Sequence, residues 1–313
     1  MTTLSPTRPV SRKPKRAYSA IPGETPGTPP WRAFKSLILL ICVVLVLLPF
    51  LAIISTSLAD AKQVNAAGGY VLWPDHASFV SYQALLQGGL VSKAMLVSVG
   101  ITVVGTALAL LCSIALAYGL SRPGSFGHKP VLMLLLMSML FAPGIIPSYL
   151  MIKQLHLINS YWSLILPTMI NGFNVIVLRS FFMNLPKELI DAARIDGASE
   201  LTILRRIVLP LSKASVAVIG LFYAVTYWNA FFNALLYIND ASKWPMQMVL
   251  RTYVVNNSQL GAGEVAAAAG APLPPTQSLQ AAILVLSIVP IVIVYPFLQR
   301  HMNKGVMVGA VKG

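Results

Sequence analysis

Neutral hydrogen-bonding side chains recur at helical spacing in two apolar segments of the sequence. A helix would place four of them on one face of the segment at 213–237: Tyr223, Thr226, Asn229 and Asn233. A similar set lies in the segment at 161–182: Thr168, Asn171 and Asn174. Such amides and hydroxyls, with the nearby rings of Tyr227 and Trp228, can bind a hydroxyl-rich ligand such as a sugar without burying a charge.

The same residue types also join helices to one another inside membranes. Helix packing is therefore the favoured interpretation, and lining of a substrate pathway is the alternative. Both remain open for the candidate pathway residues: Asn171, Asn174, Tyr223, Tyr227, Asn229 and Asn233.

Ionisable residues are absent from the middle of every long apolar segment. Ion-coupled and proton-coupled carriers usually place such groups near the membrane midplane, so this chain does not resemble them. The sequence also lacks the G-x-x-x-x-G-K-[ST] phosphate loop, and its four histidines are scattered without metal-ligand spacing. We expect no catalytic residue, metal or cofactor in this chain, and an external source of energy.

The composition predicts an all-α, polytopic membrane protein. Of the 313 residues, 56% are hydrophobic and only 10% are charged, against about 25% charged in soluble domains. Six apolar stretches reach the roughly 20 residues that a spanning helix needs. The predicted spans are about 36–58, 94–120, 131–152, 161–182, 213–237 and 278–299. Together they form one transmembrane domain at 34–313, after a Pro-rich, basic tail at 1–33 that we expect to be disordered.

The distribution of cations sets the predicted orientation. With the N-terminus inside, 18 of the 23 Lys and Arg residues lie on the cytoplasmic side, which favours cytoplasmic locations for both termini. The net charge of +14 therefore reflects topology, and no nucleic-acid-binding motif accompanies it. In the third span, Pro143 and Pro147 predict a bent or broken helix.

The segment at 183–212 is the longest internal loop on the predicted cytoplasmic side. Pro186 suits the first turn of a helix over 187–195, with Leu189, Ile190 and Ala193 on one side, and Gly197 can end it. Ser199 can cap a second helix that runs to Leu209-Pro210, with an apolar stripe at Leu201, Leu204 and Val208. The pattern predicts a helical hairpin outside the membrane, which could dock on a cytosolic partner or rest on the membrane surface.

The run Asp191-Ala192-Ala193-Arg194-Ile195-Asp196-Gly197-Ala198, followed by Ile207-Val208-Leu209-Pro210, resembles the EAA loop of bacterial ABC importer permeases. In that family the loop is the coupling helix seated in the ATPase subunit. The chain departs from the usual pattern at Asp191, where Glu is common, and at Leu204, where Phe is common. The resemblance implies ATPase coupling through ten residues: Glu188, Asp191, Ala192, Ala193, Asp196, Gly197, Ala198, Ile207, Leu209 and Pro210.

Further motifs resemble the carbohydrate-uptake branch of this family, close to the permeases for oligosaccharides or polysaccharide fragments. They are Ile146-Pro147-Ser148-Tyr149, Asn159-Ser160-Tyr161-Trp162, Tyr227-Trp228-Asn229 and the terminal Gly309-Ala310-Val311-Lys312-Gly313.

The resemblance implies a type I ABC importer transmembrane domain in the bacterial cytoplasmic membrane. Its expected partners are a second permease, two copies of an ATPase that binds ATP and Mg, and an extracytoplasmic solute-binding protein. The extracytoplasmic loop with the Ala-, Gly- and Pro-rich run 261–275 could contact that binding protein, or could be a plain insertion. The alternatives are a permease for a peptide or phosphate ester, a passive channel, and an intramembrane enzyme.

Overall fold

The structure is a computed structural model that describes residues 29–87, 89–122, 124–141, 143–255 and 274–310. Most of the predicted basic tail and of the Ala-, Gly- and Pro-rich run lies outside these residues. The described chain is helical, with no strand among the residues described. It divides into two compact units, 1–51 and 52–313, and each is described by itself.

Three long helices carry candidate membrane spans. Helix α1 covers Pro29–Leu58, α4 covers Leu90–Ser121 and α16 covers Thr276–Ala310. Helix α1 thus begins inside the predicted tail, at a Pro-Pro pair whose fixed φ and missing N–H groups suit a first turn. Two bent helix pairs raise the number of candidate spans from three to at most five within the described residues, against the six expected.

The predicted third span is interrupted, which confirms the expected break. Helix α5 (His128–Leu140) and helix α6 (Ile145–Gln154) are separate elements, with Pro143 and Gly144 between them. Gly144 has a φ of 82°, a conformation that glycine adopts without steric cost. Pro147 lies in the first turn of α6, where its missing N–H is not needed, so the break follows from Pro143 and Gly144.

The predicted fourth and fifth spans also consist of separate helices. The fourth comprises α7 (Trp162–Ile165), the 3-10 turn η1 (Leu166–Thr168) and α8 (Gly172–Met183), with a bend of 50°. The fifth comprises α12 (Lys213–Trp228) and α13 (Phe231–Tyr237). No proline marks this second interruption, so the apolar pattern alone did not reveal it.

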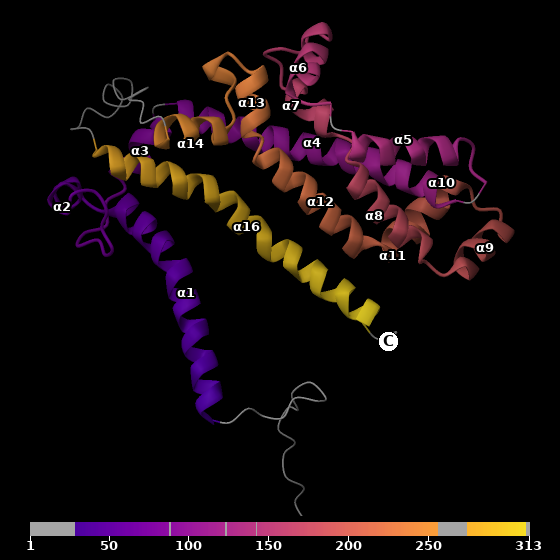
Figure 1. The fold of residues 1–313 in the computed structure, drawn as a ribbon, viewed down its shortest axis with the longest axis horizontal. Helices are drawn as coiled ribbons and strands as arrows, with labels where there is room; N and C mark the ends of the chain where they lie inside the picture. Colours follow the sequence, from indigo (N-terminus) through magenta and orange to yellow (C-terminus); the bar gives the residue numbers. More distant parts are fainter. Residues whose placement is uncertain (1–28, 88, 123, 142, 256–273, 311–313) are drawn as a thin grey trace, which may run out of the picture. The chain divides into compact units, whose positions relative to one another are not determined.

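Helix α4 runs through the middle of the second unit and packs against α8 and α12 (Figure 1). Its buried face repeats a small residue at every fourth position: Gly105, Ala109, Ser113 and Ala117. Small residues allow helix backbones to approach closely within a membrane. A Cβ atom on Gly105 would lie 2.8 Å from Cζ of Tyr227, so the ring of Tyr227 fills the space that the missing side chain leaves.

A second cluster lies at the opposite end of α4 from the hairpin (Figure 1). There α3 (Val80–Gln87) and α14 (Met246–Val254) pack against α4 and the start of α16. Their buried apolar side chains form a separate core with Ala282 and Ile283 of α16. The short helices α2 (Ala61–Ala66) and η3 (Ala241–Lys243) complete this region.

Candidate functional site: the hairpin and the faces of α4 and α12

The segment at 183–212 folds as a helical hairpin. Its first arm is α9 (Lys187–Ile195), and its second arm joins α10 (Glu200–Ile203), the π-helical turn η2 (Leu204–Val208) and α11 (Leu209–Leu211). Gly197 makes the turn with a φ of 78°. The Ser199 side chain accepts a hydrogen bond from the Thr202 N–H, so the predicted turn and cap are confirmed.

The predicted apolar stripe on the second arm is wrong in part. Leu201 is 61% exposed, whereas Ile203 and Val208 are fully buried. These two residues are five positions apart, which matches the wider turn of η2, where the Leu209 N–H donates to the Leu204 carbonyl. The prediction assumed a regular α-helical period, and it therefore placed Leu201 in the buried stripe in place of Ile203. The arm also continues past Pro210 and ends at Leu211.

The first arm presents carboxylates and two large apolar side chains to its surroundings. Ile190 is buried and Ala193 is half-buried, but Leu189, predicted on the same side, is 48% exposed. Ile195 is 87% exposed. Of the ten residues expected to couple to an ATPase, six are exposed: Glu188, Asp191, Ala192, Asp196, Gly197 and Pro210. The other four are half-buried: Ala193, Ala198, Ile207 and Leu209.

Glu200 joins both arms of the hairpin to the end of α4. Its Oε1 accepts hydrogen bonds from Nη2 of Arg194 at 2.7 Å and from Nε at 3.2 Å. Its Oε2 accepts a hydrogen bond from the hydroxyl of Tyr118 and lies 4.0 Å from Nε of Arg122. The hydrogen bond from Tyr118, reinforced by that from Arg194, lowers the pKa of the Glu200 carboxyl below its ordinary value. We call these four residues the Glu200 cluster.

The Glu200 cluster was not predicted. Glu200 directly follows the cap Ser199, so on sequence alone it resembles an acidic residue that favours a helix N-terminus. Its partner Tyr118 is 82 positions away in the chain, and no local pattern links the two. The one available signal was Tyr118 followed four residues later by Arg122, a pair that stacks at the end of α4 with the guanidinium 4.7 Å from the ring centroid.

Two candidate pathway tyrosines hold helices together. The Tyr223 hydroxyl shares a 2.7 Å hydrogen bond with Ser113 of α4 and accepts the Asn171 N–H at 3.1 Å. The Tyr227 hydroxyl donates to the Ile165 carbonyl at 3.2 Å, and both rings are about 1% exposed. Asn171 itself caps α8 by accepting the N–H of buried Asn174. For these residues, the packing interpretation matches the contacts.

The remaining candidates point elsewhere. Thr226 and Asn229 are exposed, and their side chains donate to carbonyls of their own helix, those of Phe222 and Val225. Asn233 is half-buried and belongs to α13. The prediction that all four residues share one helical face is wrong, because α12 ends at Trp228 and the chain turns before Asn233.

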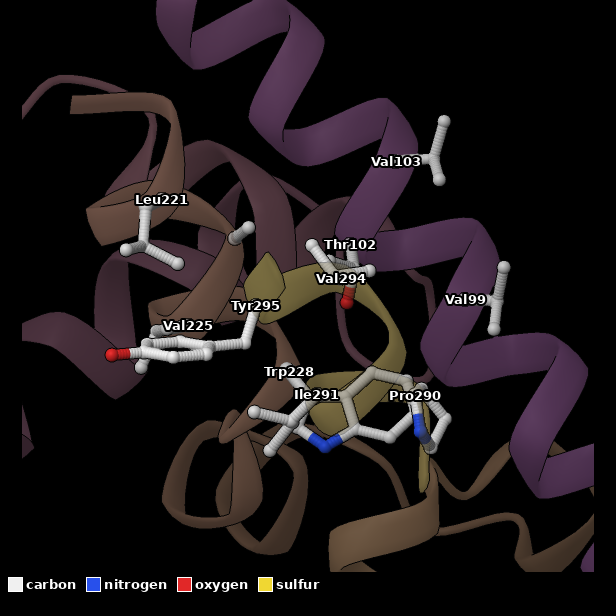
Figure 2. A pocket seen from close by; sticks show the side chains of 11 residues that line it. Val99, Thr102, Val103, Leu221, Val225, Trp228, Pro290, Ile291, Val294 and Tyr295 are labelled. Atoms are coloured by element: carbon white, nitrogen blue, oxygen red, sulfur yellow. The ribbon is translucent and has the colours of Figure 1, made fainter. Parts of the chain in front are cut away.

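An apolar pocket of about 170 Å³ lies between α4, α12 and α16. Figure 2 shows Trp228 beside Pro290 and Ile291 at this pocket. None of the lining residues is charged, and the buried Trp228 Nε1 and Thr102 Oγ1 have no hydrogen-bond partner among the residues that the structure describes. So few polar groups cannot satisfy the many hydroxyls of a sugar, and this pocket does not have the character of a carbohydrate site.

A larger cavity of about 710 Å³ opens beside the hairpin, between α4, η2 and α12. Two cations line it, Arg205 of η2 and Lys213 at the start of α12. Neither forms a salt bridge among the residues that the structure describes. Within the same residues, no group of three or more His, Cys, Asp or Glu side chains could hold a metal ion.

Comparison with known proteins gives consistent matches over nearly the whole chain. Residues 27–308 match the family described as binding-protein-dependent transport system inner membrane component. The polygalacturonan/rhamnogalacturonan transport system permease protein YtcP of Bacillus subtilis (strain 168) is 43% identical over 280 residues, covering 90% of this chain and 96% of that protein. Protein LplC of the same organism is 45% identical over 267 residues, covering 85% and 90%.

A solved structure has the same fold. It is described as a bacterial ABC transporter involved in the import of the acidic polysaccharide alginate. One of its chains superposes with a TM-score of 0.79 and 28% sequence identity, over 88% of the present chain and 98% of its own length.

Proposed function

This chain belongs to the family of binding-protein-dependent transport system inner membrane components, and from that premise we propose that it forms half of the translocation pathway for an imported oligosaccharide. It is a multi-pass membrane permease of the ABC importer class and not an enzyme, because in this family ATP hydrolysis belongs to a separate subunit. The match to YtcP over 96% of that permease's length is the observation that carries the proposal.

We further propose the composition of the complete importer. Permeases of this family work with a partner permease, an ATPase and a substrate-binding protein. For this chain the complex would contain a second, similar permease, two ATPase copies that hold ATP and Mg, and an extracytoplasmic binding protein. The proposed location is the bacterial cytoplasmic membrane, and the bias of Lys and Arg supports an orientation with both termini and the hairpin on the cytoplasmic side.

The hairpin is the proposed docking element for the ATPase. Its first arm and the following residue Asp196 display three exposed carboxylates and the 87% exposed Ile195, a mixture that suits a groove with cationic and apolar walls. Closure of the ATPase pair on ATP would move the hairpin, and the hairpin would move the helices joined to it. All ten residues of the EAA-like loop then act at or directly behind this interface.

The proposed substrate is a carbohydrate fragment released from a larger polysaccharide. The name of YtcP refers to polygalacturonan and rhamnogalacturonan, and the solved structure is described as importing the acidic polysaccharide alginate; this likeness favours the oligosaccharide class. Within the chain, Thr226, Asn229 and Asn233 are the candidates for sugar contacts, because they are exposed or half-exposed neutral hydrogen-bonding groups. Tyr223 and Tyr227 instead hold α12 against its neighbours.

The test is uptake by proteoliposomes that contain the complete complex with its binding protein. Gly197→Leu forces a side chain into the left-handed region, at a cost of roughly 1–2 kcal/mol, and distorts the hairpin turn. We expect transport to be lost while the protein stays in the membrane. Gly68→Leu is the matched control, since Gly68 has a φ of 73° and, like Gly197, open space around it. Normal uptake by the Gly197 variant would contradict the coupling role.

A further inference from the structure

The hairpin is connected to the membrane helices in two different ways. It is joined covalently to α8 at one end, and at the other it continues into α12 through a bend of 85° between Glu200–Leu211 and Lys213–Trp228. It also contacts the last turn of α4, which lies about 80 positions earlier in the chain, through the Glu200 cluster. Motion of the hairpin can therefore reach the membrane domain through the chain itself and through side-chain contacts with α4.

The contacts at α4 are directional and charge-assisted. The Tyr118 hydroxyl donates to the Glu200 side chain, approaches the Glu200 backbone carbonyl at 3.3 Å, and accepts a hydrogen bond from Nη2 of Arg122 at 2.9 Å. Hydrogen bonds with a charged partner are about twice as strong as neutral ones and hold a narrower geometry. The phenol ring is 9% exposed, so one rigid side chain joins the carboxylate to the body of α4.

The end of α4 is in turn fixed to a third helix. The Arg179 side chain of α8 donates through Nε to the Leu120 carbonyl of α4 at 2.8 Å. Beneath the cluster, Ala117, Leu120 and the hairpin residue Ile203 belong to one buried core. A displacement of Glu200 would thus act on a helix end that is already joined to α8 and packed along α12.

We infer that Glu200 and Tyr118 are positioning residues. During transport they transmit the motion of the hairpin to α4, in addition to the motion that the chain itself transmits to α12. The inference rests on the proposed importer function and adds a residue pair to it. Glu200 binds Arg194 of the first arm and Tyr118 at the end of α4, so the hairpin and α4 move together as one body. Without this pair, the hairpin loses its charge-assisted link to α4, and part of the motion transmitted to α4 is lost.

The experiment measures sugar transported per ATP hydrolysed by the complete complex in proteoliposomes. Tyr118→Phe removes one hydroxyl and keeps the ring, and Glu200→Gln removes the charge. For each variant we expect the transport ratio to fall roughly threefold to tenfold, within the range that substitutions along coupling networks produce, while ATP hydrolysis continues. The double variant should fall no further than the worse single variant, because both substitutions break the same link.

Tyr82→Phe is the matched control. The Tyr82 hydroxyl also shares a 2.7 Å hydrogen bond with a side chain, that of Ser57, away from the hairpin. This variant should keep the wild-type ratio. A purely structural role for the Glu200 cluster would lower the amount of assembled complex, and so lower transport and hydrolysis together, without changing their ratio.

Wild-type ratios in both Tyr118→Phe and Glu200→Gln would overturn the inference. If Tyr118→Phe does not assemble, Arg194→Gln tests the same link from the first arm, where the side chain is 46% exposed and its loss is tolerated more easily. Absence of transport by the wild-type complex would instead refute the importer function, so the two failures are distinguishable.

Discussion

Helix α4 makes two interfaces of opposite character. Along its middle, Gly105 and Ser113 meet the tyrosines of α12 in a buried contact that contains no charged side chain. At its end, Tyr118 and Arg122 meet the hairpin through the half-exposed carboxylate of Glu200. One interface is specified by shape and neutral hydrogen bonds, and the other by charge.

Because they differ in this way, we expect the two interfaces to have different roles. A dry contact of small residues with aromatic rings has a single close-packed arrangement, so it fixes the helices relative to one another. A half-exposed ionic contact contributes little to stability, because water competes with it, but it is specific in direction. We therefore expect substitutions in the middle of α4 to affect folding, and substitutions at its end to affect coupling.

The largest expected effect is at Gly105. In Gly105→Ala, the new Cβ atom would lie 2.8–2.9 Å from three ring atoms of Tyr227, and that ring is fully buried. Overpacking of this kind costs about 1–3 kcal/mol, so the variant should unfold at lower temperature and reach the membrane in smaller amounts. Thermal unfolding of the purified permease in detergent measures the loss.

Gly100→Ala is the control on the same helix, because a Cβ atom there meets nothing within 4 Å. It should unfold close to the wild-type temperature, helped slightly by the higher helix propensity of alanine. Equal stability of the two alanine variants would mean that the α4–α12 contact is not specified by close packing.

The next effect is at Tyr223. Tyr223→Phe leaves the Ser113 hydroxyl and the Asn171 N–H without their partner inside the membrane domain. A buried polar group without a partner costs about 1–3 kcal/mol, and stability should fall accordingly. The affinity for sugar should not change, because the hydroxyl holds helices together. A large change in uptake affinity at unchanged stability would instead place Tyr223 in the pathway.

A smaller effect is expected at Glu200, and it depends on pH. The pKa of its carboxyl is lower in the folded protein than its ordinary value of about 4.3, so the ionised form contributes stability above that value. The contribution is lost as the pH falls through the lower, folded pKa. After correction for the intrinsic pH dependence of amide exchange, the protection of the hairpin amides should fall as the pH is lowered through the folded pKa in the wild type, and Glu200→Gln should abolish this change in protection.

A high salt concentration gives a second test of the difference between the α4–hairpin and α4–α12 interfaces. Screening weakens contacts between exposed charges, so salt should loosen the hairpin at neutral pH and leave the α4–α12 contact unaffected. If salt accelerated exchange equally at both interfaces, the assignment of charge to one and shape to the other would be wrong.

The sequence predicted the features that depend on local chemistry. The turn at Gly197, the cap at Ser199 and the break near Pro143 each follow from the conformational limits of one or two residues. The π-helical turn was missed because nothing local distinguishes it from an α-helix, and it moved the buried position from Leu201 to Ile203.

Contacts distant in sequence could not be predicted in the same way. The Tyr118–Glu200 and Ser113–Tyr223 pairs join residues 82 and 110 positions apart. The polar residues at 213–237 fall into two groups, one that packs between helices and one that is exposed. Tyr223 and Tyr227 pack between helices, whereas Thr226 of α12 and Asn229, the residue after the end of α12 at Trp228, are exposed.

The smallest effect on stability is expected at Thr226, one turn from Tyr223 on the same helix. Its hydroxyl donates only to the Phe222 carbonyl of its own helix and is exposed, so Thr226→Val should change stability by no more than about 0.5 kcal/mol. If α12 lines the pathway on this side, the lost hydroxyl weakens sugar binding and raises the apparent KM for uptake. Unchanged KM in both Thr226→Val and Asn229→Ala would move the sugar contacts away from this face and onto the partner permease, leaving α12 with the packing role that Tyr223 and Tyr227 already perform.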